Sequence, residues 1–364
     1  MRVLQVTPRY FPNIGGVEII VKKISESLVE KGLPVTVYST DLSGYTTKEQ
    51  NINGVLVKRF KPLVQDPLYL PPTSFFKAIN REKIDIIHVH SAHTLLPTCA
   101  ALSKTREQKL LLQPHYHKFG QTFIRNFLLG LHKYSLKTLV FPRTDCVIVN
   151  SPYELRALLG DFSHCRDIVL IPEGVSLEEL QSVEWKPERP KRILYVGALR
   201  RYKNVGKLLK AFAYLAKTNR RQFKLVIVGD GPERRRLFDL AHELRIASQV
   251  EWKRNLSRHR LLEEYARTGV FVSLSLLESF SIVVHEAIFI GVPTVVPNFG
   301  PTADLAKEDL ATGTDSLDPE AIAEAILEAE ENPRPKNDKV LKMFLGWDKY
   351  LERILELYRR VLKD

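Results

Sequence analysis

The sequence predicts an α/β protein made of two doubly wound parallel-sheet domains. Short apolar runs with strand chemistry alternate with segments of helical periodicity along most of the 364 residues. Loops rich in glycine, proline and polar residues follow the strands, and this alternation is typical of parallel sheets covered by helices. A chain of this length also favours two domains over one.

The N-terminal half begins with a strand, a helix and a second strand. The run RVLQVTP, residues 2–8, ends at the loop RYFPNIGG, residues 9–16. Apolar residues then recur at helical spacing from Val17 to Leu28, and PVTVYST returns to strand chemistry. Further strands are predicted in GVLVKRF, IDIIHVHS, KLLLQPHYH, CVIVNS and IVLIPEGV, with a short helix at 74–81.

A second series begins after the polar stretch WKPERPK, residues 185–191, which we interpret as a domain boundary. Its predicted strands are RILYVGAL, KLVIVGDGPE, QVEWKR, VFVSLS and PTVVP. Helices are expected at 205–217, in the segment ending at 245, and from 282 onward. The final segment, FLGWDKYLERILELYRRVLKD, predicts a strongly amphipathic helix.

Composition narrows the class of protein. Hydrophobic residues make up 44% and charged residues 26%, as in ordinary globular proteins. We see no secretory signal after Met1 and no apolar run long enough to span a bilayer, and we therefore expect a cytoplasmic protein. The three cysteines are widely spaced, which argues against structural zinc or a disulfide framework. The net charge of +12 favours an anionic partner, either nucleic acid, a membrane or a phosphorylated small molecule.

Two carboxylates interrupt an apolar segment near the end of the second series. We expect Glu278 in a strand-to-helix loop and Glu286 about one turn into the helix. The amides of Ser281, Ile282 and Val283 would then lie at a helix N-terminus, where unpaired N–H groups bind phosphate. A phosphate beside carboxylates that hold sugar hydroxyls describes a nucleotide-sugar site. The alternative is that the acidic residues offset the helix dipole or pair with surface cations.

The spacing E-x7-E from Glu278 to Glu286 resembles the retaining glycosyltransferases of family four, which have the two-domain GT-B fold. Other segments match the family in order: NIGGVE, DIIHVHS, PHYH, VIVNS, IPEGV, VGALRRYKNV and VIVGDGPE. The resemblance covers Arg2 to about Pro301 and implies that the final helix crosses back to the first domain. It therefore implies an acceptor-side Rossmann-like domain at 1–172 completed by 345–364, and a nucleotide-sugar-binding Rossmann-like domain at 173–344.

The resemblance also implies roles for the matching residues. Glu286 would hold the nucleotide ribose, Glu278 would contact the transferred sugar, and Lys203 would neutralise the donor diphosphate. His115 would orient the sugar or donate to it, with a purely structural imidazole as the alternative. The other expected donor-binding residues are Gly15, Gly16, Arg200, Arg201, Gly229, Ser279, Phe280, Ser281, Ile282 and Val283. His88, His90, His93 and His117 lie in similar loops and rank below His115. No metal or other cofactor is implied, because the nucleotide sugar is a substrate.

The sequence departs from the family pattern at a few positions. Ala198 follows Gly197 where the family usually has arginine, so either Arg200 or Arg201 would supply that charge. Ser281 stands where the phosphate loop usually has glycine, and Glu173 stands where the interdomain turn usually has asparagine. These differences indicate a subfamily or a reduced activity.

A basic amphipathic segment, residues 118–143, suggests a lipid-linked acceptor. Its apolar residues at helical spacing are Ile124, Phe127, Leu128 and Leu131, and its cations are Lys118, Arg125, Lys133, Lys137 and Arg143. This combination suits an anionic membrane surface or a lipid phosphate, and equally a helix packed on its own domain with a solvated basic face.

Rival functions stay open at this point. A GT-B sugar-nucleotide epimerase or phosphorylase would bind similar ligands. A nucleic-acid-binding protein would explain the charge, but no recognised nucleic-acid module is present, and no GxGxxG fingerprint supports a nicotinamide cofactor. The donor sugar, its base and the acceptor do not follow from the sequence.

Overall fold

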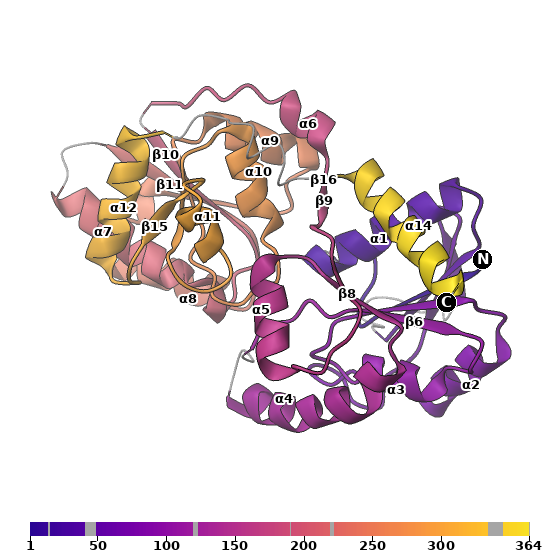
Figure 1. Ribbon diagram of the computed structural model, residues 1–364. Helices are drawn as coiled ribbons and strands as arrows, with labels where there is room; N and C mark the ends of the chain where they lie inside the picture. Colours follow the sequence, from indigo (N-terminus) through magenta and orange to yellow (C-terminus); the bar gives the residue numbers. More distant parts are fainter. Residues whose placement is uncertain are drawn as a thin grey trace. The chain divides into compact units, whose positions relative to one another are not determined.

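The computed structural model describes residues 1–13, 15–40, 49–118, 123–189, 191–218, 222–333 and 345–363. The chain divides into two compact units: unit 1 is Met1–Gly174 with Trp347–Asp364, and unit 2 is Val175–Gly346 (Figure 1). The sequence assignment had put these boundaries at 172/173 and 344/345. The connections, β9 (Gly174–Val175) and β16 (Leu345–Gly346), pair as a two-stranded sheet.

The interpretation of residues 185–191 as a domain boundary is wrong. This stretch lies inside unit 2, where the Trp185 indole N–H donates to the Thr268 carbonyl at 2.7 Å. The amide of Lys186 donates to the Ala266 carbonyl at 2.8 Å. Its polar, proline-bearing composition therefore marks an extended segment bonded to the end of a helix.

Unit 1 contains an eight-stranded sheet in the order β3-β4-β2-β1-β5-β6-β7-β8, parallel except at the β3–β4 pair. Its strands are β1 (Val3–Thr7), β2 (Val35–Ser39), β3 (Glu49–Ile52), β4 (Val55–Arg59), β5 (Ile86–His90), β6 (Lys109–Gln113), β7 (Cys146–Val149) and β8 (Ile168–Leu170). Its helices are α1 (Gly16–Glu30), α2 (Thr73–Arg81), α3 (Leu96–Ser103), α4 (Phe123–Ser135), the π-helical η1 (Leu136–Val140), η2 (Phe141–Arg143), α5 (Pro152–Asp161) and α14 (Trp347–Lys363).

The two faces of this sheet differ in chemistry. Leu4 and Val6 of β1 belong to the apolar core that also contains residues of α2, α3 and η1. Because side chains alternate along a strand, Gln5 points to the opposite face, where its amide bonds to Tyr358 on α14. Helix α3 had not been predicted, because it is buried and apolar and shows no amphipathic period.

Unit 2 contains a six-stranded, fully parallel sheet in the order β12-β11-β10-β13-β14-β15. Its strands are β10 (Lys191–Val196), β11 (Phe223–Val228), β12 (Val250–Lys253), β13 (Val270–Val272), β14 (Thr294–Pro297) and β15 (Thr312–Thr314). Its helices are α6 (Leu177–Gln181), η3 (Arg201–Lys203), α7 (Val205–Thr218), α8 (Arg234–Glu243), η4 (Ala247–Gln249), α9 (Arg258–Arg267), α10 (Ile282–Ile290), α11 (Ala303–Lys307) and α12 (Pro319–Glu331).

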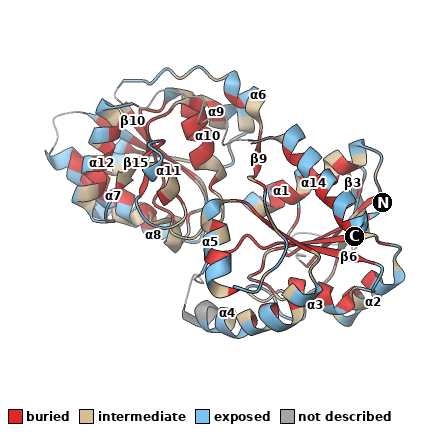
Figure 2. Cartoon of the chain, in the orientation of Figure 1, coloured by how far each residue is buried: buried red, intermediate tan, exposed pale blue. Residues whose placement is uncertain are grey.

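Helices cover both faces of the unit 2 sheet. Ile193 and Tyr195 of β10 pack into a core shared with α7, α8 and α12, whereas Leu194 and Val196 pack into a core shared with α9, α10 and α11. Figure 2 shows these strands buried and the helices exposed on one side only. The predicted doubly wound architecture is confirmed in both units.

The strand order of each unit indicates where a ligand would bind. The order reverses between β1 and β5 in unit 1, and between β10 and β13 in unit 2. In open parallel sheets, ligands bind outside the carboxyl ends of the strands at this switch point. A ligand-binding site is therefore expected in the loops that follow these strands.

Candidate active site

Two glycine loops of unit 2, after the neighbouring strands β10 and β11, meet backbone to backbone beside the switch point. Gly229, after β11, has a φ of +154°, and a Cβ there would lie 1.9 Å from the Gly197 carbonyl oxygen, after β10. The Leu199 amide also donates to the Asp230 carbonyl at 2.9 Å. Any side chain at Gly229 would force these loops apart, so this glycine has a structural role beside its predicted donor-binding role.

Lys203 and Glu278 form a buried ion pair in the same region. Lys203 ends η3, and the next residue, Asn204, is left-handed and donates to the Leu274 carbonyl at 2.8 Å, which ties the loop to the segment after β13. The side chains of the pair are 16% and 9% exposed, respectively. Residues 75 positions apart are thus brought together by the adjacency of β10 and β13.

The pair is held in its charged state. Burial opposes ionisation of Glu278, but the neighbouring Lys203 ammonium prevails and keeps the pKa of Glu278 below its usual value. The hydroxyls of Ser275 and Ser281 lie close enough to favour the carboxylate, although neither reaches hydrogen-bonding geometry. Burial likewise opposes the Lys203 charge, and Glu278 raises the pKa of Lys203 in spite of it.

Helix α10 begins directly after this pair, with Ser281 as its N-cap. The His285 Nδ1–H donates to the Ser281 carbonyl at 2.7 Å, and the imidazole stacks on the Phe280 ring at 3.9 Å between centroids. Burial lowers the pKa of His285 to about 4, so the ring is neutral at pH 7. The amides of Ile282 and Val283, in the first turn, have no intrahelical acceptors.

Glu286, in the second turn of α10, is clamped by two residues of α9. Its Oε1 lies 2.7 Å from Arg258, and its Oε2 accepts from the Tyr265 hydroxyl at 3.2 Å. Burial raises the pKa of Glu286, and Arg258 only partly offsets this. Arg258 also contacts Glu179 on α6 at 2.8 Å. Glu286 is therefore a buried carboxylate with partners, as the cost of burying a charge requires.

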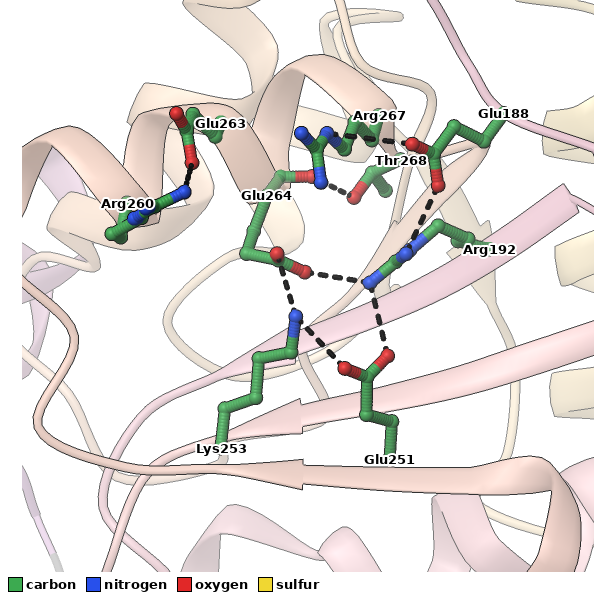
Figure 3. Close-up of polar contacts among 9 residues, drawn as sticks. All are labelled: Glu188, Arg192, Glu251, Lys253, Arg260, Glu263, Glu264, Arg267 and Thr268. Atoms are coloured by element: carbon green, nitrogen blue, oxygen red, sulfur yellow. Dashed lines mark hydrogen bonds and ion pairs between the residues drawn. The ribbon is translucent and has the colours of Figure 1, made fainter.

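An ion cluster around the buried Arg192 and Glu264 links α9 to the sheet, as Figure 3 shows. Arg192 of β10 contacts Glu264 of α9 at 2.8 Å, Glu188 at 3.0 Å and Glu251 of β12 at 3.3 Å. Lys253 of β12 contacts the second oxygen of Glu264 at 2.8 Å. The cluster thus sets the position of the helix that carries Arg258 and Tyr265.

In unit 1, the predicted glycines lie at the start of α1. Gly15 has an extended backbone that any residue can adopt, so its conformation does not require glycine. A Cβ there would lie 2.2 Å from a carboxylate oxygen of Glu18, so a side chain at this position would displace the end of Glu18. Glu18 is buried and pairs with Arg9 at 2.8 Å. Gly16 has open space around its Cβ position.

His115 lies in a buried polar network at the carboxyl ends of β5, β6 and β7. Its backbone is left-handed, with a φ of +47°. Its Nδ1 lies 3.1 Å from the Asn150 amide nitrogen, and its Nε2 lies 3.4 Å from Nδ1 of His90. The Asn150 side chain also donates to Glu173 at 2.9 Å. Burial lowers the pKa values of His115 and His90, so both imidazoles are neutral at pH 7.

The same network reaches the last helix of the chain. His90 Nε2 lies 2.8 Å from Oε1 of Gln5, and the Gln5 amide donates to the Tyr358 hydroxyl at 3.0 Å. Tyr358 in turn lies 2.8 Å from Nδ1 of His88, and burial lowers the pKa of His88 to about 3. His93 and His117 instead stack on each other at 3.8 Å between ring centroids.

Within unit 2 the structure thus brings Lys203 to Glu278. Ser279, Phe280 and Ser281 follow Glu278 directly, and Glu286 lies one turn into α10. Arg200 is half-buried and Arg201 exposed, and neither has an acidic partner among the described residues. Within the described ranges, no three His, Cys, Asp or Glu side chains are grouped as metal ligands would be.

Sequence reasoning missed the partners of the predicted residues. Arg258 and Tyr265 lie on α9, which had not been predicted, although Ser257 as N-cap before an LLxxY pattern is a usable signal. Gln5, Asn150 and the α14 tyrosines were missed as well. Gln5 is a polar residue inside an otherwise apolar buried strand, which is the signal that could have found it.

Two family models match the chain and together span both units. Glycosyltransferase Family 4 matches residues 14–179, and Glycosyl transferases group 1 matches residues 177–342.

Individual proteins also resemble the chain over much of its length, two of them in sequence and one in its solved structure. An uncharacterized glycosyltransferase of Methanocaldococcus jannaschii is 26% identical over 251 residues, which is 64% of each chain. The alpha-monoglucosyldiacylglycerol synthase of Streptococcus pneumoniae is 24% identical, over 98% of this chain and 85% of that protein. The solved structure of Anabaena HepE in complex with UDP and glucose superposes with a TM-score of 0.73 at 15% identity, covering 98% and 99% of the two chains.

Proposed function

Since the chain belongs to the group 1 glycosyltransferases of family 4, with the GT-B fold and a nucleotide-sugar donor, we propose that it transfers a hexosyl group to a hydroxyl acceptor with retention at the anomeric carbon. The proposed donor is a UDP- or GDP-linked hexose. UDP and glucose are the ligands named for the HepE complex, and a glucosyldiacylglycerol appears in the name of the Streptococcus relative.

The observation that carries this proposal is the Lys203–Glu278 pair at the switch point of unit 2, next to the N-terminus of α10. A diphosphate needs positive charge and N–H donors, and a sugar needs an acceptor for its hydroxyls. Lys203 and the first amides of α10 supply the positive charge and the N–H donors, and Glu278 supplies the acceptor. Arg200 and Arg201, on the loop before Lys203, are the candidates for a second cation on the diphosphate.

The proposed reaction follows from these roles. The bond between the anomeric carbon and the diphosphate oxygen breaks, and the acceptor hydroxyl forms its new bond on the same face. The acceptor proton moves to the departing phosphate oxygen, so no protein base is required. Lys203 would neutralise the leaving diphosphate, and Glu286 would hold the ribose, with Arg258 and Tyr265 fixing its carboxylate. In unit 1, His115 would contact the transferred sugar, and Gly15 and Gly16 would leave room for backbone approach.

Donor binding tests the assignment. Removing the Glu286 carboxylate by Glu286→Ala should weaken binding of the preferred donor by about 10- to 100-fold, the value of charge-assisted hydrogen bonds. Glu179→Ala is the matched control, because it removes the other partner of Arg258 and leaves Glu286 in place. A thermal-shift screen of UDP- and GDP-sugars would select the donor, and calorimetry would compare the variants. Wild-type affinity in Glu286→Ala would contradict the assignment.

We further propose that the acceptor is lipid-linked and that α4 contacts an anionic membrane. Phe127, Leu131 and Tyr134 recur at helical spacing on α4 and are 63%, 61% and 73% exposed. Lys137 is exposed nearby, whereas Lys133 pairs with Asp161 at 2.8 Å. Exposed aromatic and aliphatic residues beside cations suit an interfacial helix. The side chains of the predicted Ile124 and Arg125 lie outside the described residues.

Vesicle flotation tests the membrane proposal. The protein should float with vesicles containing anionic phospholipid, and less with purely zwitterionic vesicles. Leu131→Asp should abolish flotation, while Leu102→Asp, at a 53% exposed site on α3, should not. Equal flotation of wild type and Leu131→Asp would refute the proposal. No helix within the described ranges has the length and apolar character needed to cross a bilayer.

A further inference from the structure

The unit 1 network has one consistent direction of hydrogen bonding. A carboxylate oxygen accepts hydrogen bonds, so Glu173 Oε1, at 2.9 Å, requires the Asn150 side chain to present its NH₂ group. The Asn150 Oδ1 then accepts from the Gln113 amide at 2.8 Å, which agrees with the same orientation. Glu173 therefore fixes which end of the Asn150 amide faces His115, because the Gln113 amide can itself turn to match either orientation.

This orientation determines the His115 tautomer. The Asn150 NH₂ group lies 3.1 Å from His115 Nδ1, so that nitrogen must accept, and the proton of the neutral ring must be on Nε2. Each following bond agrees: His115 Nε2–H faces His90 Nδ1, and His90 Nε2–H then donates to Gln5 Oε1 at 2.8 Å. The opposite tautomer would set two donors against each other at the Asn150 contact. Its Nδ1–H would face Glu173 Oε1, but at 3.5 Å, which is longer than the 3.1 Å to the Asn150 nitrogen.

We propose that Glu173 is a positioning residue that, through Asn150, holds His115 in the tautomer carrying its proton on Nε2. This inference rests on the proposed contact between His115 and the transferred sugar. It specifies that contact, since His115 then acts as a hydrogen-bond donor to a sugar oxygen and cannot act as a base through Nε2. The present acceptor, His90 Nδ1, is 3.4 Å away. A bond of that length is weak, so a sugar oxygen can replace it.

The first measurement is the tautomer itself. Protein labelled with ¹⁵N in its ten histidines is examined by long-range ¹H–¹⁵N NMR, and the His115 signals are identified by their loss in His115→Gln. We expect wild-type His115 to be the Nε2–H form. Glu173→Leu, which removes the acceptor, should let the Asn150 amide turn and give a mixture of both tautomers. Glu173→Gln offers an oxygen again and should restore the single Nε2–H form.

The second measurement is turnover with the preferred donor. Loss of a group that orients a functional histidine typically costs about tenfold in activity, and we expect that loss in kcat for Glu173→Leu. The donor KM should change by less than about twofold, because the proposed diphosphate and ribose contacts lie in unit 2. Glu173→Gln should recover kcat. If Glu173→Leu does not fold, Glu173→Asn provides the same test, because its shorter side chain withdraws the oxygen from Asn150.

Tyr358→Phe is the control at the far end of the network. It removes a hydroxyl that bonds to Gln5 and His88 but leaves the Asn150–His115 contact in place, so the His115 tautomer should not change. An Nδ1–H tautomer in the wild type would overturn the proposal. A pure Nε2–H tautomer retained in Glu173→Leu would overturn it too. Wild-type turnover in His115→Ala would instead contradict the proposed role of His115, and the NMR result would still decide whether Glu173 holds the ring.

Discussion

The strand order of each sheet reverses at one switch point, but the polar groups at the carboxyl ends of the strands find their partners in different ways. In unit 1, neutral imidazoles, amides and tyrosine hydroxyls are linked by hydrogen bonds, as in the contacts of His90 with Gln5 and His115, and the network ends at one carboxylate, Glu173. In unit 2, formal charges are paired, as in Lys203–Glu278 and Arg258–Glu286. The same doubly wound architecture thus carries two kinds of polar site.

The difference follows from what stabilises each kind of group. A neutral network is satisfied by geometry alone, so it can orient hydroxyl groups without attracting ions. A buried ion pair needs its partner, and a cation held there can be shared with an anionic ligand. This comparison matches the proposal that unit 2 binds the nucleoside diphosphate and that unit 1 supplies His115 to the sugar.

The largest effect is expected from removing a charge in unit 2. Lys203→Ala should lower turnover by about 10²- to 10³-fold, because the leaving diphosphate loses a preorganised cation. Lys207→Ala removes an exposed lysine on α7 and is the matched control. Initial rates of nucleoside diphosphate release measure both. Turnover within twofold of wild type in Lys203→Ala would contradict the proposal that the paired charges of unit 2 serve the diphosphate.

A second charge tests stability within unit 2. Arg192→Met should destabilise the unit by about 2 kcal/mol, because the buried Glu264 loses one of its two cationic partners and keeps Lys253. Arg260→Met, on the same helix as Glu264, removes an arginine that is 66% exposed and should cost about 0.5 kcal/mol or less. Hydrogen exchange of β12 amides under increasing denaturant reports on this unit alone. Similar losses of unfolding free energy in both variants would show that the ion pairs of Arg192 in Figure 3 stabilise the unit no more than an exposed ion pair does.

In unit 1 the sharpest test is pH. Burial raises the pKa of Glu154 from 4.5 to about 7, although Asn150 and Tyr116 donate backbone N–H bonds to its carboxylate. The unfolded chain releases this proton near pH 4.5 and the folded chain near pH 7. The stabilisation is therefore complete below pH 4.5 and is lost as the pH rises to 7, by about 3 kcal/mol at most.

The Glu154 contribution can be isolated by difference. His88 and His285 act in the other direction, since their lowered pKa values cost stability as the pH falls below 6.5. Subtracting the unfolding free energies of Glu154→Gln from those of the wild type removes these histidines. The difference should change between pH 4.5 and 7 and be flat above pH 8. A flat difference throughout would show that Glu154 titrates normally.

The smallest expected effect comes from one neutral hydroxyl. Tyr358→Phe should destabilise unit 1 by about 1 kcal/mol, because Gln5 and His88 each lose a buried hydrogen bond while the ring packing is kept. Hydrogen exchange of the β1 and β5 amides would measure it. The loss should not depend on salt, in contrast to charge removal at exposed pairs of unit 2, and a strong salt dependence would contradict the neutral character of the network.

Local sequence determined much of this protein. Short apolar runs predicted most strands of both sheets, because the central parallel strands are buried on both faces. Helical periodicity placed α1 and α14, each of which buries one face. Helices α7 and α10 were predicted as well. Glu278, Glu286, Lys203 and His115 were identified from short segments whose residue types and spacing match a family. Elements without such periodicity, such as α3 and the short edge strand β3, were missed.

Tertiary structure alone decided the partners. Lys203 meets Glu278 because β10 and β13 are neighbours, and Arg192 meets Glu264 because α9 packs on that sheet. Tyr358 reaches Gln5 across almost the whole chain, at a separation of 353 residues. Sequence periodicity records which face of an element is buried, whereas strand order and helix packing determine what that face touches. The kinds of residue in the site could therefore be read from the chain, but their pairing, protonation and tautomers could not.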